Sequence, residues 1–116
     1  MKTMIWRGGN NFTLDKVEIP KVIEGTCLIK THTAGVCGTD VHITQGLFPS
    51  PVNVALGHEF SGEVIEIGKN VEKSLLNKSI AAHTVSGCRK CESCRKWSVG
   101  HCENHKRRAG AFSEYL

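Results

Sequence analysis

Four of the six cysteines lie within fifteen residues, in the order Cys88-x2-Cys91-x2-Cys94-x7-Cys102, and no other feature constrains the fold as much. Four thiolates at such short spacing can surround a tetrahedral Zn²⁺ and leave no open coordination position, which is the pattern of a structural site. Residues 86–108 show no apolar periodicity, so metal binding would have to supply the folding free energy of this segment. The spacing therefore predicts a lobe at 86–108 that is held by structural zinc.

Other uses of these cysteines fit less well. A [4Fe–4S] site shares the first three cysteines but needs its fourth about three residues further on, followed by proline. Here Glu103 follows Cys102, and the last gap is seven residues, which disfavours an iron–sulfur cluster. Four unligated cysteines are hard to reconcile with so short and polar a stretch. His101 and His105 could compete as ligands, but four cysteines already fill the site, so we expect both at the surface.

Length and composition narrow the class of protein. The chain has 116 residues, which fits one domain, and its 40% hydrophobic and 22% charged residues exclude a disordered tail. No run reaches the ~18–20 apolar residues of a membrane span, and the N-terminus lacks the apolar stretch of a secretory signal. We therefore expect a cytoplasmic protein without a membrane partner, in a reducing compartment where clustered thiols bind metal.

The hydrophobic pattern predicts a mainly β fold. Alternating or β-branched segments indicate strands at 2–6, 12–19, 26–34, 59–67 and 79–85, with another strand beginning at 111. The stretch between Gly38 and Gly46 predicts one or two helical turns with Thr39 or Asp40 as N-cap, and the prolines in 47–56 indicate a loop. These elements favour a barrel of short antiparallel strands with one extruded loop.

Single residues within this pattern carry their own expectations. Cys27 falls in an alternating strand and should be buried. Trp6 and Trp97 should cover apolar surface, and the ring of His83 should lie at the surface.

A second group of metal-ligand residue types comprises Cys37, His58 and Glu59. Catalytic zinc needs three protein ligands and one open position, and these residues offer a thiolate, an imidazole and a carboxylate. Neighbouring residues of a strand point to opposite faces unless a bulge intervenes, so Glu59 is the least secure of the three. The spacing alone equally allows Cys37 to be a small buried hydrophobe and His58 a core histidine.

The two groups together carry a specific resemblance. CGTDVH at 37–42, LGHEFSGEVIEIG at 56–68 and the cysteine lobe resemble, in order and spacing, the zinc-dependent alcohol dehydrogenases of the medium-chain dehydrogenase/reductase family. The match covers essentially the whole chain, and RKCESCRKWSVGHCEN is similar to the lobe of bacterial members that act on primary or secondary alcohols. The resemblance implies a GroES-like, partly open antiparallel β-barrel with an extruded structural-zinc loop.

The resemblance also implies roles for individual residues. A catalytic zinc would be bound by Cys37 and His58, with Glu59 as a ligand or near-ligand, in addition to the structural zinc of the lobe. Asp40 matches the carboxylate that orients the ligand histidine.

Two further positions match a proton relay. Thr39 matches the hydroxyl that accepts the proton of a small alcohol or polyol substrate, and His42 matches the imidazole that passes it to solvent. The alcohol would then donate hydride to NAD or NADP.

The chain has no G-x-G-x-x-G motif after a strand and no βαβ pattern, so it shows no site for a dinucleotide. We therefore expect residues 1–116 to be a single catalytic domain, truncated before the Rossmann domain and inactive without a nucleotide-binding domain. An open sheet edge would favour a homo-oligomer, and a separate chain could carry the nucleotide domain.

The alternative function is a zinc-stabilised binding module that contacts nucleic acid or protein through a basic lobe. The segment from Cys88 through Arg108 contains seven Lys and Arg, against Glu92 and Glu103. Four thiolates on one Zn²⁺ leave a net charge of −2 that nearby cations would offset, and aromatic residues for base stacking are nearly absent from the lobe. The sequence therefore disfavours a nucleic-acid partner.

Overall fold

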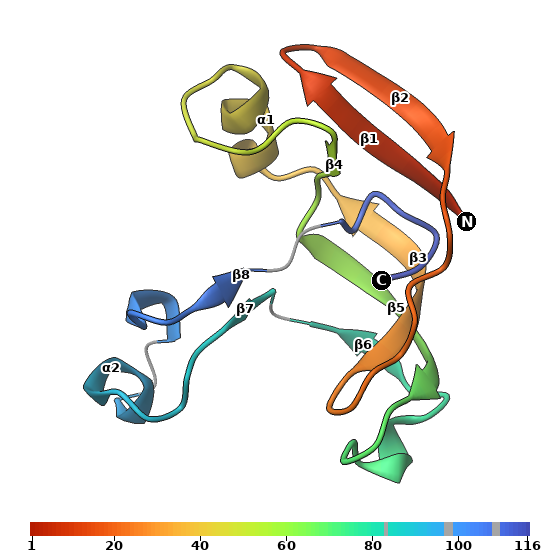
Figure 1. The fold of residues 1–116 in the computed structure, drawn as a ribbon, viewed down its shortest axis with the longest axis vertical. Coiled ribbons are helices and arrows are strands. Elements are labelled where there is room, and N and C mark those ends of the chain that lie inside the picture. The colour runs from red at the N-terminus through yellow and green to blue at the C-terminus, as the bar shows by residue number, and fades with distance from the viewer. Residues whose placement is uncertain (83, 97–98, 108–109) are drawn as a thin grey trace.

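The protein consists of three small antiparallel sheets and a metal-ligand lobe, seen in a computed structural model that describes residues 1–82, 84–96, 99–107 and 110–116 (Figure 1). The strand orders are β2-β1-β4, β3-β5-β6 and β7-β8. None of the helices in these ranges is long and apolar enough to cross a membrane. The expectations for His83 and Trp97 concern residues outside the described ranges.

The first sheet is a hairpin with a short added strand. β1 (Lys2–Gly8) pairs with β2 (Asn11–Lys16), and β4 (Val54–Ala55) pairs with the other edge of β1. Trp6 is buried in this sheet, and its indole nitrogen donates to the Gly9 carbonyl at 2.8 Å. The prediction of a loop over 47–56 is wrong at its end, because Val54 and Ala55 have a free strand edge to pair with.

The second sheet contains the longest ladder. β3 (Cys27–Gly35) runs antiparallel to β5 (Glu59–Ile67), from Cys27 opposite Ile67 to Gly35 opposite Glu59, and β6 (Ser79–Ala81) pairs with the far edge of β5. The strands predicted over 26–34 and 59–67 are confirmed. A Cβ at Gly62 would lie 2.3 Å from the Lys30 carbonyl oxygen, so this glycine marks a close backbone approach within the sheet.

Residues 111–116 connect the two sheets. The Phe112 carbonyl accepts the Met4 amide of β1 at 2.8 Å, and the Glu114 carbonyl accepts the Thr31 amide of β3 at 2.9 Å. Leu116 and Ile29 exchange a pair of backbone hydrogen bonds at 2.8 and 2.9 Å. The strand predicted from residue 111 therefore exists as isolated bridges to both neighbours. The result is the predicted mainly β, partly open barrel (Figure 1).

Two other predicted elements differ from the structure. The single strand predicted over 79–85 is divided between β6 and β7 (Val85–Ser86), which belong to different sheets. The strand predicted over 12–19 ends at Lys16, just after the polar pair Asp15-Lys16 that breaks its alternation. Both errors arise because alternation identifies a strand but not the partner that keeps it extended.

Two α-helices among the described residues lie at the two metal-ligand regions. α1 (Gly38–Thr44) follows β3, and Cys37 is its N-cap, not Thr39 or Asp40 as predicted. η1 (Lys73–Leu75) lies between β5 and β6. The lobe at the lower left of Figure 1 contains α2 (Glu92–Arg95), η2 (Val99–His101) and β8 (Lys106–Arg107), which pairs with β7.

The core lies between the second sheet and the 111–116 segment. Val64 is 1% exposed and clusters with the buried Ile29, Phe60 and Ala111. Cys27 packs against this cluster and is half-buried, so its prediction as a buried strand residue holds in part. The small core depends on close packing at each of these positions.

We expect Val64→Ala to lower the free energy of unfolding by about 2 kcal/mol, because it removes two methyl groups from the centre of the cluster and leaves a cavity. Ile65→Ala is the control, since Ile65 is the next residue of β5 and is 37% exposed. Urea denaturation measures both variants. Equal destabilisation by the two would contradict the placement of the core.

Candidate metal centres

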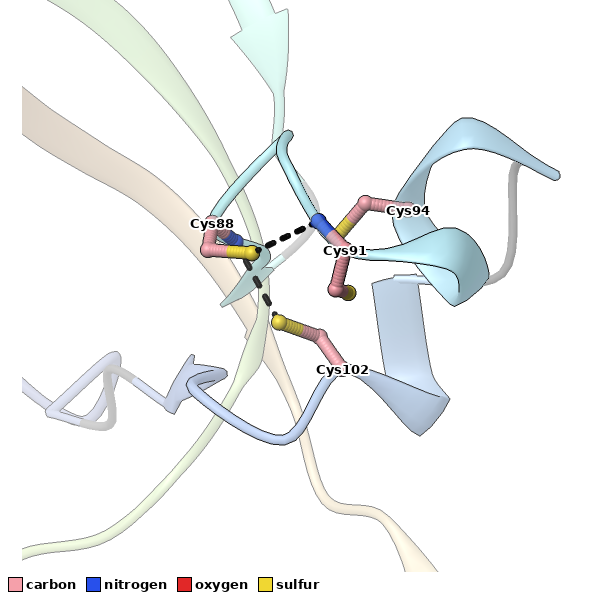
Figure 2. Close-up of side chains that lie close together, drawn as sticks. All are labelled: Cys88, Cys91, Cys94 and Cys102. Carbon is pink, nitrogen blue, oxygen red and sulfur yellow. Dashed lines mark hydrogen bonds between the residues drawn. The ribbon is translucent and has the colours of Figure 1, made fainter.

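The four lobe cysteines converge on one point. Cys88 follows β7, Cys91 is the N-cap of α2, Cys94 lies within α2, and Cys102 follows η2. Their sulfur atoms all lie within 4.8 Å of one another, and Figure 2 shows the four side chains pointing toward a common centre. Cys102 is 2% exposed and the other three are half-buried. The geometry thus brings together all four cysteines that the spacing selected.

Backbone amides are arranged around these sulfurs. The amide of Lys90 donates to Cys88 Sγ at 3.4 Å. The amide of Cys91 donates to the same sulfur at 3.3 Å, and the amide of Cys88 donates to Cys102 Sγ at 3.3 Å (Figure 2). These hydrogen bonds require a tight turn, which Arg89 makes with a φ of 59°. The turn and the first residues of α2 therefore form an N–H-lined cradle for negatively charged sulfur.

The pKa values of two of these thiols are shifted in opposite directions by their surroundings. Hydrogen bonds from the Cys91 and Lys90 amides lower the pKa of Cys88 to about 6, whereas burial raises the pKa of Cys94 to about 12. A thiolate is the form of cysteine that binds a metal, so the backbone favours this form at Cys88. Four mutually close sulfurs and no carboxylate are the donor set of a closed tetrahedral zinc site, which these residues fit.

Gly87 is a member of the lobe that the sequence analysis missed. A Cβ at this position would lie 2.5 Å from Cys94 Sγ and 3.2 Å from Val99 Cγ1. Glycine is thus needed because of space, and its position directly before Cys88 was the only available signal. His101 and His105 are exposed, as predicted, and the group of converging ligands contains cysteines only.

The second predicted group also converges. The ligand atoms of Cys37, His58 and Glu59 lie within 4.8 Å of one another. His58 precedes β5 and Glu59 is its first residue, so the alternation of a strand does not separate the two side chains. Gly57, with a φ of 86°, turns the chain just before them. Glu59 is exposed and Cys37 and His58 are half-buried, so this group opens to solvent as a catalytic site must.

Asp40 connects the parts of this second group. Its carboxylate is buried, with the residue 4% exposed, and accepts the backbone amides of Cys37 at 3.0 Å and of Gly57 at 3.2 Å. The same carboxylate lies 3.6 Å from His58 Nδ1. One side chain therefore fixes the start of α1, the turn before β5 and the imidazole that follows it.

Thr39 and His42 lie on the first turns of α1. The Cys37 thiol donates to Thr39 Oγ1 at 3.7 Å, so the hydroxyl is adjacent to a candidate ligand. His42 is exposed, and its ring centroid lies 5.7 Å from that of Phe48. A half-buried hydroxyl followed three residues later by an exposed imidazole gives two proton-carrying groups on one helix face.

Phe112 packs against the turn at Gly57 and was not predicted from the sequence. A Cβ at Gly57 would lie 2.7 Å from the Phe112 ring, so the ring packs directly on the glycine. The Gly57 carbonyl accepts the Gly110 and Ala111 amides at 3.0 and 3.1 Å. No sequence signal connects positions 57 and 112, because the contact arises from the path of 110–116 across the barrel.

The family model for the alcohol dehydrogenase GroES-like domain matches residues 23–116. The chain belongs to this family. Curated relatives include an L-threonine 3-dehydrogenase from Caldanaerobacter subterraneus subsp. tengcongensis, which is 39% identical over 111 residues, covering 87% of this chain and 31% of the relative. A sorbitol dehydrogenase from Halalkalibacterium halodurans is 32% identical over 114 residues, covering 94% and 33%.

Solved structures agree with this family. A zinc-dependent alcohol dehydrogenase 2 from Streptococcus pneumonia superposes with a TM-score of 0.86 at 29% identity, covering 100% of this chain and 35% of its own. An acetophenone reductase from Geotrichum candidum, solved in complex with NAD, gives 0.83 at 31% identity, covering 99% and 36%. This chain thus spans about a third of the length of the relatives it matches. The resemblance to zinc-dependent alcohol dehydrogenases predicted from the sequence is confirmed.

We expect Asp40→Ala to lower the free energy of unfolding by about 2–4 kcal/mol, because two amides of this GroES-like domain lose their acceptor in a buried place. Asp40→Asn keeps one acceptor oxygen and should lose less. Denaturation is measured with EDTA present, so that metal binding does not contribute. Equal stability of Asp40→Ala and the unmodified chain would contradict the connecting role of this carboxylate.

We expect Gly87→Ala to weaken zinc binding by the four cysteines about tenfold or more, the range seen when groups that orient metal ligands are changed. The new methyl group displaces Cys94 Sγ. Gly100→Ala is the control, because Gly100 lies in the same lobe and a Cβ there would meet no atom of the described residues within 4 Å. Competition with a chromophoric chelator reports both affinities, and equal values would overturn the steric argument.

Proposed function

We propose that this chain is the alcohol-binding catalytic domain of a zinc-dependent dehydrogenase that oxidises a primary or secondary alcohol or polyol, with NAD or NADP as hydride acceptor. The observation that carries the proposal is the open group of Cys37, His58 and Glu59, whose ligand atoms lie within 4.8 Å of one another. The relatives named an L-threonine 3-dehydrogenase and a sorbitol dehydrogenase suggest a hydroxyl on a small polar substrate.

In this proposal the two metal groups have different tasks. Cys88, Cys91, Cys94 and Cys102 hold a structural zinc that stabilises the lobe 86–108, within one domain spanning 1–116. Cys37, His58 and Glu59 hold a catalytic zinc and leave a position for the substrate hydroxyl. When bound there, zinc would supply Lewis acidity that lowers the pKa of that hydroxyl.

Asp40 acts on His58 in this scheme. Its carboxylate faces Nδ1 at 3.6 Å, which leaves Nε2 as the nitrogen available to a metal. A carboxylate on the far nitrogen of a ligand histidine fixes the ring orientation and increases its basicity. The hydrogen bonds from the Cys37 and Gly57 amides keep Asp40 in place at the same time.

Thr39 and His42 move the proton. Thr39 Oγ1, 3.7 Å from Cys37 Sγ, accepts the proton of the substrate hydroxyl. As it does so, Thr39 gives up its own hydroxyl proton, which His42, exposed on the next turn of α1, accepts and releases to solvent. Side chains positioned to accept or donate a proton in this way typically increase the reaction rate by about 10²–10⁴-fold.

We propose that completion of the active site depends on partners. The substrate is a small alcohol, and the nucleotide would be held by a dinucleotide-binding domain, on the same polypeptide or on another. The relatives are about three times as long as the matched chain, which leaves room in them for such a domain.

We expect two zinc ions per chain by elemental analysis of protein purified without chelators. Cys37→Ser should leave one zinc, because the lobe still binds, and Cys91→Ser should remove the other. Cys27→Ser is the matched control, since this cysteine belongs to neither group of converging ligands in the described residues, and it should leave both. One zinc that is insensitive to Cys37→Ser would contradict the catalytic site and favour a zinc-stabilised binding module.

Substrate access to the second site has its own test. Cobalt(II) is exchanged into the Cys37 site, and its visible spectrum is recorded while sorbitol or L-threonine is added. A spectral change that saturates with the alcohol, and that Thr39→Val weakens, is the expected result. A spectrum that neither compound alters would contradict an open, alcohol-binding metal site.

A further inference from the structure

The last residue of β3 is a glycine whose backbone conformation other residues could also adopt. Gly35 ends β3 and lies opposite Glu59, at the last pair of the β3–β5 ladder. The glycines with left-handed φ are 8, 9, 25, 46, 57 and 110 among the described residues, so Gly35 adopts a φ that any residue could take. The absence of a side chain at this position therefore leaves room for a neighbouring group.

The space above Gly35 is occupied by one side chain. A Cβ built there would lie 3.0 Å from Glu59 Oε2 and 3.4 Å from Glu59 Cβ, and apart from its chain neighbours no other atom of the described residues would lie within 4 Å. The Glu59 side chain thus folds over the bare Cα of Gly35. A carboxylate oxygen of Glu59 lies within 4.8 Å of the sulfur of Cys37 and of a ring nitrogen of His58. Cys37 is two residues after Gly35 in the chain.

A methyl group at position 35 would lie 3.0 Å from Glu59 Oε2 and 3.4 Å from Glu59 Cβ, closer than ordinary contacts, so the Glu59 side chain would have to shift by a few tenths of an ångström. The carboxylate can rotate outward because Glu59 is exposed. The fold would therefore remain intact while the carboxylate was displaced from its place beside Cys37 and His58. In a strand with ordinary φ, alanine is also more favourable than glycine, because it restricts the unfolded chain.

We propose that Gly35 is a positioning residue: its missing side chain makes the place in which the Glu59 carboxylate lies beside Cys37 and His58. The inference rests on the proposed metal site and adds the reason that Glu59 can belong to it. Gly35 acts only through the carboxylate, the group that a side chain at this position would crowd.

The test compares metal affinity at the Cys37 site in five proteins. They are the unmodified chain, Gly35→Ala, Glu59→Ala, the double variant Gly35→Ala/Glu59→Ala, and Gly38→Ala. The last is the matched control, because Gly38 lies on the other side of Cys37, has an ordinary φ, and a Cβ there would meet no atom within 4 Å in the part of the chain that the structure describes. The four-cysteine site is kept filled with zinc while cobalt(II) and a competing chelator report the second site.

Gly35→Ala is expected to weaken cobalt binding about tenfold, the range for groups that orient metal ligands, and by no more than Glu59→Ala, which removes the carboxylate itself. The double variant should bind no more weakly than Glu59→Ala, and Gly38→Ala should match the unmodified chain. The cobalt d–d bands of Gly35→Ala should shift in the direction seen for Glu59→Ala, since the carboxylate is displaced in the first variant and absent from the second. The thermal unfolding midpoint of Gly35→Ala should be equal to or higher than that of the unmodified chain.

Other results separate the failure of this inference from that of the proposed function. Unchanged affinity in Gly35→Ala, or a further loss in the double variant, would show that the methyl group does not act through Glu59 and would overturn the proposal. A lower unfolding midpoint in both Gly35→Ala and the double variant would assign glycine a purely structural role there. Absence of a second metal in the unmodified chain would instead overturn the metal site itself.

Discussion

The buried carboxylate of Asp40 is the interaction on which the candidate catalytic site depends. It accepts amides from Cys37 and Gly57, which are 20 residues apart in the chain, and lies 3.6 Å from His58 Nδ1. Cys37 leaves β3 and His58 enters β5, so one side chain holds together the ends of the two longest strands. A buried carboxylate is costly to desolvate unless it is hydrogen-bonded, and here that requirement fixes the geometry of two candidate ligands.

The two metal-ligand groups are built by different physical means. The lobe cysteines come from one short segment, and backbone amides stabilise their negative charge, most clearly at Cys88. Cys37, His58 and Glu59 are placed by the β3–β5 ladder, by a left-handed glycine at 57 and by the space above Gly35. The first group is local and closed, whereas the second is assembled by the barrel and open. This difference matches a division between structural and catalytic metal sites.

Most strands could be predicted because alternation and β-branched residues are strong signals in 26–34 and 59–67. Predictions failed where an element depends on a partner: 79–85 divides between two sheets, and Val54–Ala55 becomes a strand through the edge of β1. The N-cap of α1 was misassigned because cysteine is not a usual cap, while Asp40 at the third helical position supplies the reciprocal hydrogen bond.

The sequence by itself determined the lobe and the identity of the candidate ligands, because thiol spacing over fifteen residues and the order of CGTDVH and GHE are properties of the chain alone. Only the tertiary structure decided that Glu59 could join Cys37 and His58. The alternation rule separates neighbouring side chains of a strand, and it does not apply here because His58 lies before β5 begins. The packing of Phe112 on Gly57 and the space over Gly35 are likewise contacts between distant segments, which only a folded barrel brings together.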